Sequence, residues 1–371
     1  MIKEGRIAGL SVKPQTRRTY KLDLGNIPED KFVYLNISVK SNVTTPWAAA
    51  GYELGFEQFV LCEPVTSDVK ADGKALKVSE EKYSISVIDG ETVYTFDKLH
   101  GTLASVVDNG RELLASPLEL NIWRAPTDND RKIKLEWAKY GYPNATHMCY
   151  GTELVSVGEK EIKVSAKISM GEAAMPPIFH SAVTYTVISG KGVKVDVDAD
   201  VRHDAISLPR FGVQLSMVED SENVVYFGRG DAESYLDKRH ASKMGVYRTT
   251  ASKNFEHYVR PQENMAHTDT KWVSVASVAG HGLLFLRADN DFSFNCCHFT
   301  PKQLTETKHD YELKPLKETV VNIDYRHNGI GSASCGPTLP DRLSLLEKKI
   351  NFSFRILPAF VNNVCPFEEI K

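Results

Sequence analysis

The densest group of chemically capable side chains lies at residues 121–130, which read Asn-Ile-Trp-Arg-Ala-Pro-Thr-Asp-Asn-Asp. The indole of Trp123 favours burial, and the guanidinium of Arg124 favours a carboxylate, a carbonyl or a ring face as its partner. Asp128 and Asn129 can hydrogen-bond to their own backbone, which stabilises a turn after the rigid proline. The stretch therefore predicts an ordered loop. Its residue types fit a structural corner as well as a binding site.

Carboxylates are the next candidates, because two of them at a fixed separation can act as a nucleophile and an acid/base. The largest local cluster comprises Asp231, Glu233 and Asp237 in the segment 228–239. Their spacing on a loop does not fix the separation that catalysis needs, so we expect solvent-exposed turn acids. Their predicted partners are the cations of the same segment: Arg229, Lys238 and Arg239.

Another polar turn is predicted at residues 258–264, with the sequence Tyr-Val-Arg-Pro-Gln-Glu-Asn. Glu263 could accept a hydrogen bond from Arg260 there, and Asn264 bounds the turn. His309 is the one histidine that could be interpreted as a base, but no nucleophile or orienting partner accompanies it in the sequence. No catalytic residue is therefore predicted in this chain.

The glycine-rich segment 328–337, Asn-Gly-Ile-Gly-Ser-Ala-Ser-Cys-Gly-Pro, permits a sharply folded loop. Ser334 and Cys335 lie within it. No neighbouring residue indicates a lowered thiol pKa for Cys335, so we do not expect a nucleophile. Cys335 fits the wall of a pocket and a small buried residue equally well.

Composition excludes several classes of function. The chain has 371 residues, of which 42% are hydrophobic and 25% charged, and a formal net charge of -3. We therefore expect two domains and no attraction to nucleic acid or to an anionic membrane. No apolar run approaches the roughly 20 residues of a membrane span. The first residues lack the apolar core of a signal peptide, which favours the cytoplasm but leaves the compartment open.

The six cysteines have no C-x-x-C spacing, and no histidine lies at metal-finger spacing from a cysteine pair. We expect free thiols that mostly pack as small apolar groups, and no metal site.

Alternation of apolar and polar residues predicts strands in the first part of the chain, at 20–24, 32–39 and 52–61. Three or four strands fit part of a β-sandwich, with Trp47 as an aromatic anchor in the connecting loop. The polar stretch 63–77 contains proline and Asp-Gly and is typical of a linker. It places a domain boundary near residue 71, between a domain at 1–70 and a domain at 71–371.

The second domain is predicted to be almost entirely β. Its expected strands are 83–88, 92–97, 103–107, 112–115, 152–157, 161–169, 181–188, 192–199, 211–218, 223–227, 272–278, 282–287, 291–296, 319–325 and 349–356. Asn109-Gly110 favours a type I′ hairpin, and short helices are expected near 132–140 and 301–307. So many strands favour one large antiparallel two-sheet sandwich over two small ones.

Five blocks, in collinear order within residues 20–358, resemble the C-terminal region of bacterial β-galactosidases of glycoside hydrolase family 2. The most specific is Trp-Arg-Ala-Pro-Thr-Asp-Asn-Asp at 123–130. The others are Trp-Ala-x-Ala-Gly with the following Glu-Gln strand at 47–58, the acidic segment 228–239, the turn and strand start at 258–272, and the glycine-rich block at 322–337. Asp231 stands where the family often has proline. Cys335 stands where some members carry a tryptophan that stacks on sugar, and a thiol offers no ring face.

This resemblance implies an all-β fold in which a partial immunoglobulin-like β-sandwich precedes a large antiparallel galactose-mutarotase-like supersandwich. It implies a parent enzyme that hydrolyses terminal β-D-galactosides with retention, using two glutamates on a barrel that this chain lacks. Mg²⁺ and Na⁺ are expected in that barrel, and no cofactor is expected in this chain. The implied role of this part is to wall the active site. The pocket candidates are Cys335, Ser334, Arg124, Asp128, Asn129, Glu233, Glu263 and Asn264.

The expected partners are the galactoside substrate and the catalytic barrel, supplied either in the same chain or by a separate large subunit. The parent is expected to be a homo-oligomer. A different class remains open from the residues: a free-standing carbohydrate-binding or sugar-epimerising module of the mutarotase-like fold.

Overall fold

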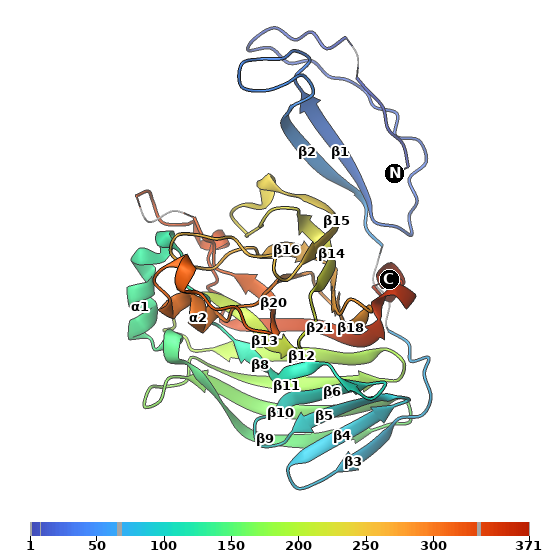
Figure 1. Cartoon of the computed structure of the whole chain (residues 1–371), viewed down its shortest axis with the longest axis vertical. Helices are drawn as coiled ribbons and strands as arrows, with labels where there is room; N and C mark the ends of the chain where they lie inside the picture. Colours follow the sequence, from blue (N-terminus) through green and yellow to red (C-terminus); the bar gives the residue numbers. More distant parts are fainter. Residues whose placement is uncertain (1, 8, 65–68, 332–334, 371) are drawn as a thin grey trace. The chain divides into compact units, whose positions relative to one another are not determined.

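The structure is a computed structural model that describes residues 2–7, 9–64, 69–331 and 335–370 (Figure 1). The chain divides into two compact units, residues 1–65 and 66–371. The boundary predicted near residue 71 lies a short distance beyond this division.

The first unit is built on one antiparallel ribbon, β1 (Val33–Lys40) and β2 (Glu53–Cys62). The strands predicted at 32–39 and 52–61 are confirmed. The strand predicted at 20–24 is wrong, because that segment has no ladder partner among the described residues, and alternation alone cannot supply one. Trp47 is 67% exposed and lies edge-on to Tyr52, so it is not a buried anchor here.

The second unit consists of two antiparallel sheets. In the described residues, the nine-stranded sheet has the order β15 (Lys243–Thr250), β14 (Asn223–Gly230), β17 (Trp272–Ala276), β18 (His281–Arg287), β21 (Lys349–Phe360), β12 (Gly192–Val201), β11 (Phe179–Ile188), β10 (Glu161–Gly171) and β9 (Thr146–Val157). The ten-stranded sheet has the order β16 (His267–Thr270), β19 (Phe292–Cys297), β20 (Thr319–His327), β13 (Arg210–Met217), β8 (Leu114–Asn121), β6 (Thr102–Asp108), β5 (Thr92–Asp97), β4 (Ser84–Asp89) and β3 (Lys77–Glu80), with β7 (Arg111–Glu112) beside β6.

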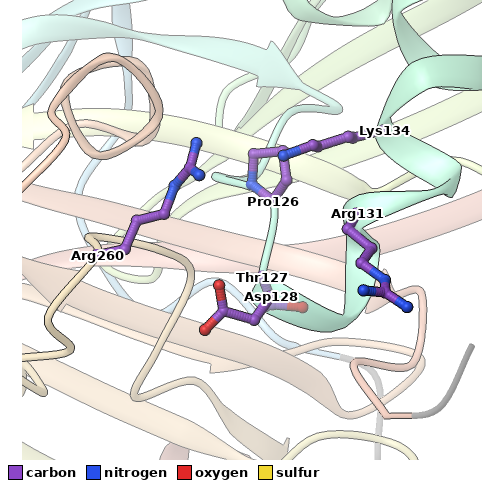
Figure 2. A pocket seen from close by; sticks show the side chains of 6 residues that line it. All are labelled: Pro126, Thr127, Asp128, Arg131, Lys134 and Arg260. Carbon is purple, nitrogen blue, oxygen red and sulfur yellow. The ribbon is translucent and has the colours of Figure 1, made fainter. Parts of the chain in front are cut away.

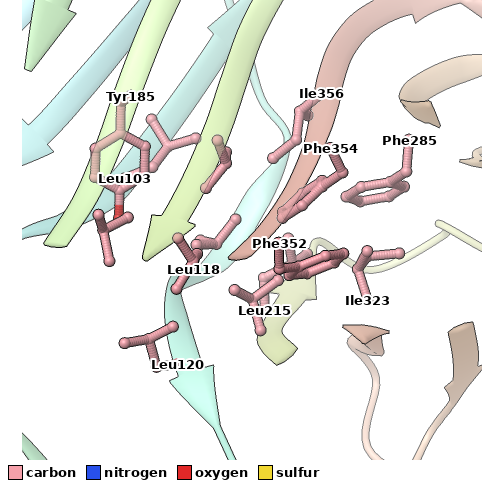
Figure 3. Packing of buried hydrophobic residues seen from close by; sticks show 14 of the residues in the cluster. Leu103, Leu118, Leu120, Tyr185, Leu215, Phe285, Ile323, Phe352, Phe354 and Ile356 are labelled. Atoms are coloured by element: carbon pink, nitrogen blue, oxygen red, sulfur yellow. The ribbon is translucent and has the colours of Figure 1, made fainter. Parts of the chain in front are cut away.

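The hydrophobic core lies between these two sheets (Figure 3). Ile350, Phe352 and Phe354 alternate along β21 and are almost fully buried, whereas Asn351, between Ile350 and Phe352, is exposed. Leu215 on β13 and Ile323 on β20 belong to the same cluster and come from the other sheet. Period-two alternation therefore turns one face of each strand into a shared apolar layer, which stabilises the sandwich.

Each strand predicted in the second domain overlaps an observed one, and the all-β two-sheet architecture is confirmed. The predicted strand at 112–115 falls on the end of β7 and the start of β8, and the rest of β8 was not predicted. The prediction missed β3, β15 and β16, which are short or poorly alternating strands at sheet edges. Asn109 and Gly110 both have positive φ, at 49° and 76°, as a type I′ turn requires.

The helices are short and lie outside the sheets. The two predicted ones are confirmed as α1 (Ile133–Lys139) and α2 (Pro301–Glu306). The remaining helical turns are α3 (Pro366–Glu369) and the 3-10 helices η1 (Asp128–Arg131), η2 (Tyr142–Asn144), η3 (Arg239–Ala241), η4 (Asp310–Glu312), η5 (Asp341–Leu343) and η6 (Val361–Asn363). Within the described part of the chain, no helix combines the length and apolarity needed to cross a membrane.

The six cysteines form no disulfide, and all of them belong to the described residues. Cys296 and Cys297 are buried, and burial raises the pKa of both thiols. The prediction that most cysteines pack as small apolar groups holds for this pair but not for Cys335 and Cys365, which are exposed.

Candidate functional site

A fully buried arginine ties the loop after β8 to the loop after β20. Arg124 has no exposed surface, and its Nη2 donates to both carboxylate oxygens of Asp130 at 3.1 Å. Its Nη1 donates to the carbonyl of Asn328, and Nη2 donates to the carbonyl of Gly329 at 3.2 Å. The guanidinium also lies 5.7 Å from the ring centre of Trp137. A planar cation with several donors can hold two loops at once, which a point charge cannot do.

Two sequence neighbours of Asp130 connect the same loop to other segments. Asp128 and Gln262 exchange hydrogen bonds of 3.0 and 3.2 Å, and Asn129 donates to the carbonyl of Ile330 at 3.0 Å. Asp128 and Asn129 were predicted to hold the turn themselves. The carboxylate that does so is Asp130, which accepts from the backbone N–H of Thr127 at 2.9 Å.

These contacts join residues 121–131, 262–264 and 328–331 into one structure, which we call the loop platform. The N–H of Glu263 donates to the carbonyl of Ala125 at 3.1 Å, which adds a backbone link. Asp237 accepts from the N–H groups of Ile330 and Gly331 at 3.1 and 2.6 Å. The platform is therefore held by main-chain groups and buried charge, which gives its exposed side chains defined positions.

A second buried network lies beneath the platform, on the ten-stranded sheet. Arg210, with no exposed surface, donates to Asp324 through Nε at 3.0 Å and through Nη2 at 2.5 Å. It also lies 3.4 Å from Glu263 and donates to Asn295 at 3.2 Å. Arg210 therefore pairs with an acid of the sheet, Asp324. The predicted Glu263–Arg260 bond is wrong, because Glu263 is directed inward to Arg210, Asn295 and Tyr235.

The charges in this network fix one another's protonation. Burial alone would raise the pKa of Asp324, but Arg210 and His327 lower it below its ordinary value. Burial and the charge of Arg210 lower the pKa of His327, although Asp324 opposes them. At neutral pH His327 is therefore uncharged, and its Nε2–H donates to Asp324 at 3.1 Å.

Of the acids at 231–237, Asp231 is exposed as expected, Glu233 and Asp237 are partly buried, and the predicted pairing with Lys238 is confirmed for Glu233. Glu233 pairs with Lys238 and accepts from the N–H of Met265 at 3.1 Å. Arg229 and Arg239 instead pair with Asp269, each at 2.5 Å. The prediction of Arg229 and Arg239 as partners of this cluster is wrong, because Asp269 lies between the two guanidinium groups.

A pocket of about 340 Å³ opens on the outer side of the platform (Figure 2). Its lining residues are Pro126, Thr127, Asp128, Arg131, Lys134 and Arg260. Three cations and one carboxylate surround this opening, so it presents net positive charge.

The predicted pocket residues thus fall into three groups. Arg124, Glu263 and Asn264 are buried and hold the platform from within. Asp128, Asn129 and Glu233 are partly or fully exposed beside it, and Cys335 is exposed. Ser334 lies outside the described residues. A sugar contact by any member of the set stays a prediction.

Sequence reasoning missed Asp130, Asp324 and Asn295 as structural partners. The available signal was a charged or amide residue inside an apolar strand pattern, as in Val-Val-Asn-Ile-Asp-Tyr at 320–325. Such a residue must find a partner when its strand is buried. Among the described residues, no group of three or more His, Cys, Asp or Glu side chains could hold a metal ion.

Acid should destabilise the second unit through His267. Asn254 donates its amide to two carbonyls, so its oxygen faces Nε2 of His267, 2.8 Å away, and Nδ1 lies 3.1 Å from both the hydroxyl of Tyr226 and the carbonyl of Arg229. Burial lowers the pKa of this ring from 6.5 to about 4. Between pH 6.5 and about 4, the His267 ring is protonated in the unfolded chain but not in the folded one. The free energy of unfolding therefore decreases as the pH falls below 6.5, by about 3 kcal/mol in total.

Urea unfolding between pH 7 and pH 4.5 would measure this loss. The exposed His240 supplies a matched control, because His240→Gln should leave the slope unchanged. A His267→Gln variant that keeps the full slope would contradict the assignment.

Comparison with known proteins gives consistent family matches. The family described as Beta galactosidase small chain matches residues 89–356, and Beta-galactosidase, domain 4 matches residues 1–62. The β-galactosidase of Actinobacillus pleuropneumoniae is 34% identical over 87% of this chain and 32% of its own length. That of Staphylococcus xylosus is 34% identical over 92% of this chain and 34% of its own length.

A solved galactose 1-epimerase from Lactobacillus acidophilus NCFM covers 77% of this chain and 99% of its own, at 8% identity and a TM-score of 0.38. The chain spans about a third of the length of the curated relatives that it matches. With a small-chain match over most of its residues and a domain 4 match before it, this chain belongs to the β-galactosidase small-chain family and is a β-galactosidase C-terminal region.

Proposed function

We propose that this chain walls the active site of a β-galactosidase and supports the catalytic part of that enzyme. The parent enzyme hydrolyses terminal β-D-galactosides with retention. Its catalytic glutamates, and the groups that bind Mg²⁺ and Na⁺, belong to the portion that this chain does not include. The support for this division is that the relatives are β-galactosidases about three times as long as this chain.

The observation that carries the proposal is the Arg124 clamp. A fully buried guanidinium holds the ends of two loops that are 200 residues apart in sequence, by bonds to Asp130 and to the carbonyls of Asn328 and Gly329. A buried guanidinium costs free energy unless acceptors are held at hydrogen-bond distance from it. Asp130 and the two carbonyls supply acceptors here, so the loops that carry them have defined positions. A rigid surface is what a wall needs if it is to keep a reaction centre in shape.

The alternative of a sugar-epimerising module has less support. Two acids do converge on the ten-stranded sheet, Glu263 and Asp324, but Arg210 occupies the space between them. All three side chains are buried, and Arg210 pairs with both acids. A saccharide would have to displace that ion network to reach either carboxylate.

A chromogenic β-galactoside tests the proposal. The chain alone should give no turnover above background, whereas the chain mixed with, or fused to, the barrel-bearing remainder of a family member should hydrolyse it. Activity in the mixture identifies a separate large subunit as sufficient, and activity only in the fusion identifies a requirement for one continuous chain. Turnover by the chain alone, or an inactive fusion that is folded, contradicts the proposal.

A further inference from the structure

We propose that the outer face of the nine-stranded sheet carries a second binding site, which takes a neutral saccharide. The site is a trough of about 530 Å³ lined by residues of strands β9 to β12. Figure 1 shows where these four strands lie in the sheet. Its lining residues are Tyr150, Lys167, Ile168, His180, Ser181, Ala182, Asp198 and Asp200. None of them belongs to the loop platform or to the pocket beside it.

The trough exists because a small side chain stands among large ones. Ala182 on β11 is exposed on the outer face, and its cross-strand partners are Lys167 on β10 and Asp198 on β12. His180, two residues earlier on the same face, pairs in register with Asp200. A methyl group surrounded by longer side chains leaves a depression in the sheet surface.

One wall of the trough is an aromatic ring held in place. Tyr150 is on edge strand β9 at a register shift, where β9 carries an extra residue opposite Lys167 and Ile168. Its hydroxyl bonds to the hydroxyl of Ser169 at 2.9 Å, and its ring centre lies 6.1 Å from that of His180. The side chain nevertheless remains 58% exposed. A ring fixed at its tip with an open surface is ready to receive a flat apolar partner.

The polar groups around the ring select the class of ligand. Asp198 and Asp200 offer acceptors, Lys167 offers donors, and His180 can do either. Asp200 has only a loose ion pair with Lys349, at 3.9 Å. Lys167 carries one positive charge, and Asp198 and Asp200 carry two negative charges, so the electrostatic potential over the trough is small. A small potential favours an uncharged ligand over an anion or a multivalent cation. A pyranose combines an apolar ring face with hydroxyls that both donate and accept, and it matches this surface.

Calorimetric titration of the 371-residue chain with lactose tests the site. We expect millimolar binding, weakened about tenfold or more in Tyr150→Ala, because stacking and burial of the ring face are lost. Ala182→Leu should weaken it similarly by filling the floor, and its outward position spares the core. Val155→Ala is the control, since Val155 lies on the same strand, is also 58% exposed and is outside the trough.

A flat titration, or binding that both trough variants leave unchanged, would overturn the proposal. Galacturonate should bind more weakly than galactose, and equal affinity would refute the assignment to a neutral ligand. These variants should still restore hydrolysis in the mixed or fused enzyme, so this site and the proposed supporting role can fail separately.

Discussion

Replacing Arg210 by methionine should lower the free energy of unfolding of the second unit by about 3–5 kcal/mol. The substitution removes the cation that faces Asp324 at 2.5 Å and Glu263 at 3.4 Å, and both acids are buried. Methionine fills much of the volume, so the loss reports the uncompensated charge more than a cavity. Urea unfolding followed by circular dichroism measures it.

The deficit should shrink as the pH falls. The charge of Arg210 contributes to the lowered pKa of His327, and without it Asp324 favours protonation of that ring. A protonated His327 would then supply part of the missing positive charge. A simple packing defect would show no such pH dependence.

Arg202→Met provides the matched control. Arg202 pairs with Asp204 at 2.6 Å near the surface, where Asp204 is 68% exposed. Such a pair is worth at most about 1 kcal/mol. Equal losses for Arg210→Met and Arg202→Met would show that the buried network contributes no more to the stability of the sandwich than an exposed ion pair does.

Replacing Arg124 by lysine should reduce the hydrolysis restored by mixing or fusion at least about tenfold while the chain stays folded. Lysine keeps the charge but offers one nitrogen, so it cannot serve Asp130 and the carbonyls of Asn328 and Gly329 together. The platform loops should then lose their fixed spacing. Rates on a chromogenic galactoside measure the effect, and circular dichroism checks the fold.

Arg248→Lys is the control for this experiment, since Arg248 is exposed on β15, outside the platform. It should restore hydrolysis as well as the unaltered chain does. Full activity with Arg124→Lys would mean that the hydrogen bonds of Arg124 are not needed to shape the active site. The family assignment would be unaffected by that result.

The strands of the second unit could be predicted because their pattern is local. Alternation along 349–356 already indicates which side of β21 is buried, and Asn109-Gly110 already specifies its turn. The same rule failed at 20–24, where alternation exists but no neighbouring strand completes the ladder in the described residues. A strand is a property of a pair, so a pattern in one segment is not sufficient.

The candidate site was only partly predictable for a related reason. The sequence singled out Arg124 and its need for an acid or carbonyl, but it could not select Asp130 over Asp128. Nor could it bring Asn328 and Gly329 to the same guanidinium. Glu263 shows the same limit: Arg260, three residues earlier, was the predicted partner, whereas the structure supplies Arg210 from strand β13.

By itself, the sequence determined the all-β class, most strand positions and the loops at 121–130 and 328–337. Through its matching blocks it also determined the family. Those features depend on side-chain type and on spacing along the chain. Only the tertiary structure decided which charges meet, which predicted pocket residues are buried, and where a trough opens on the outer sheet. These depend on contacts between segments as far as 205 residues apart, and the free energy of a buried charge is set by the partners that folding brings to it.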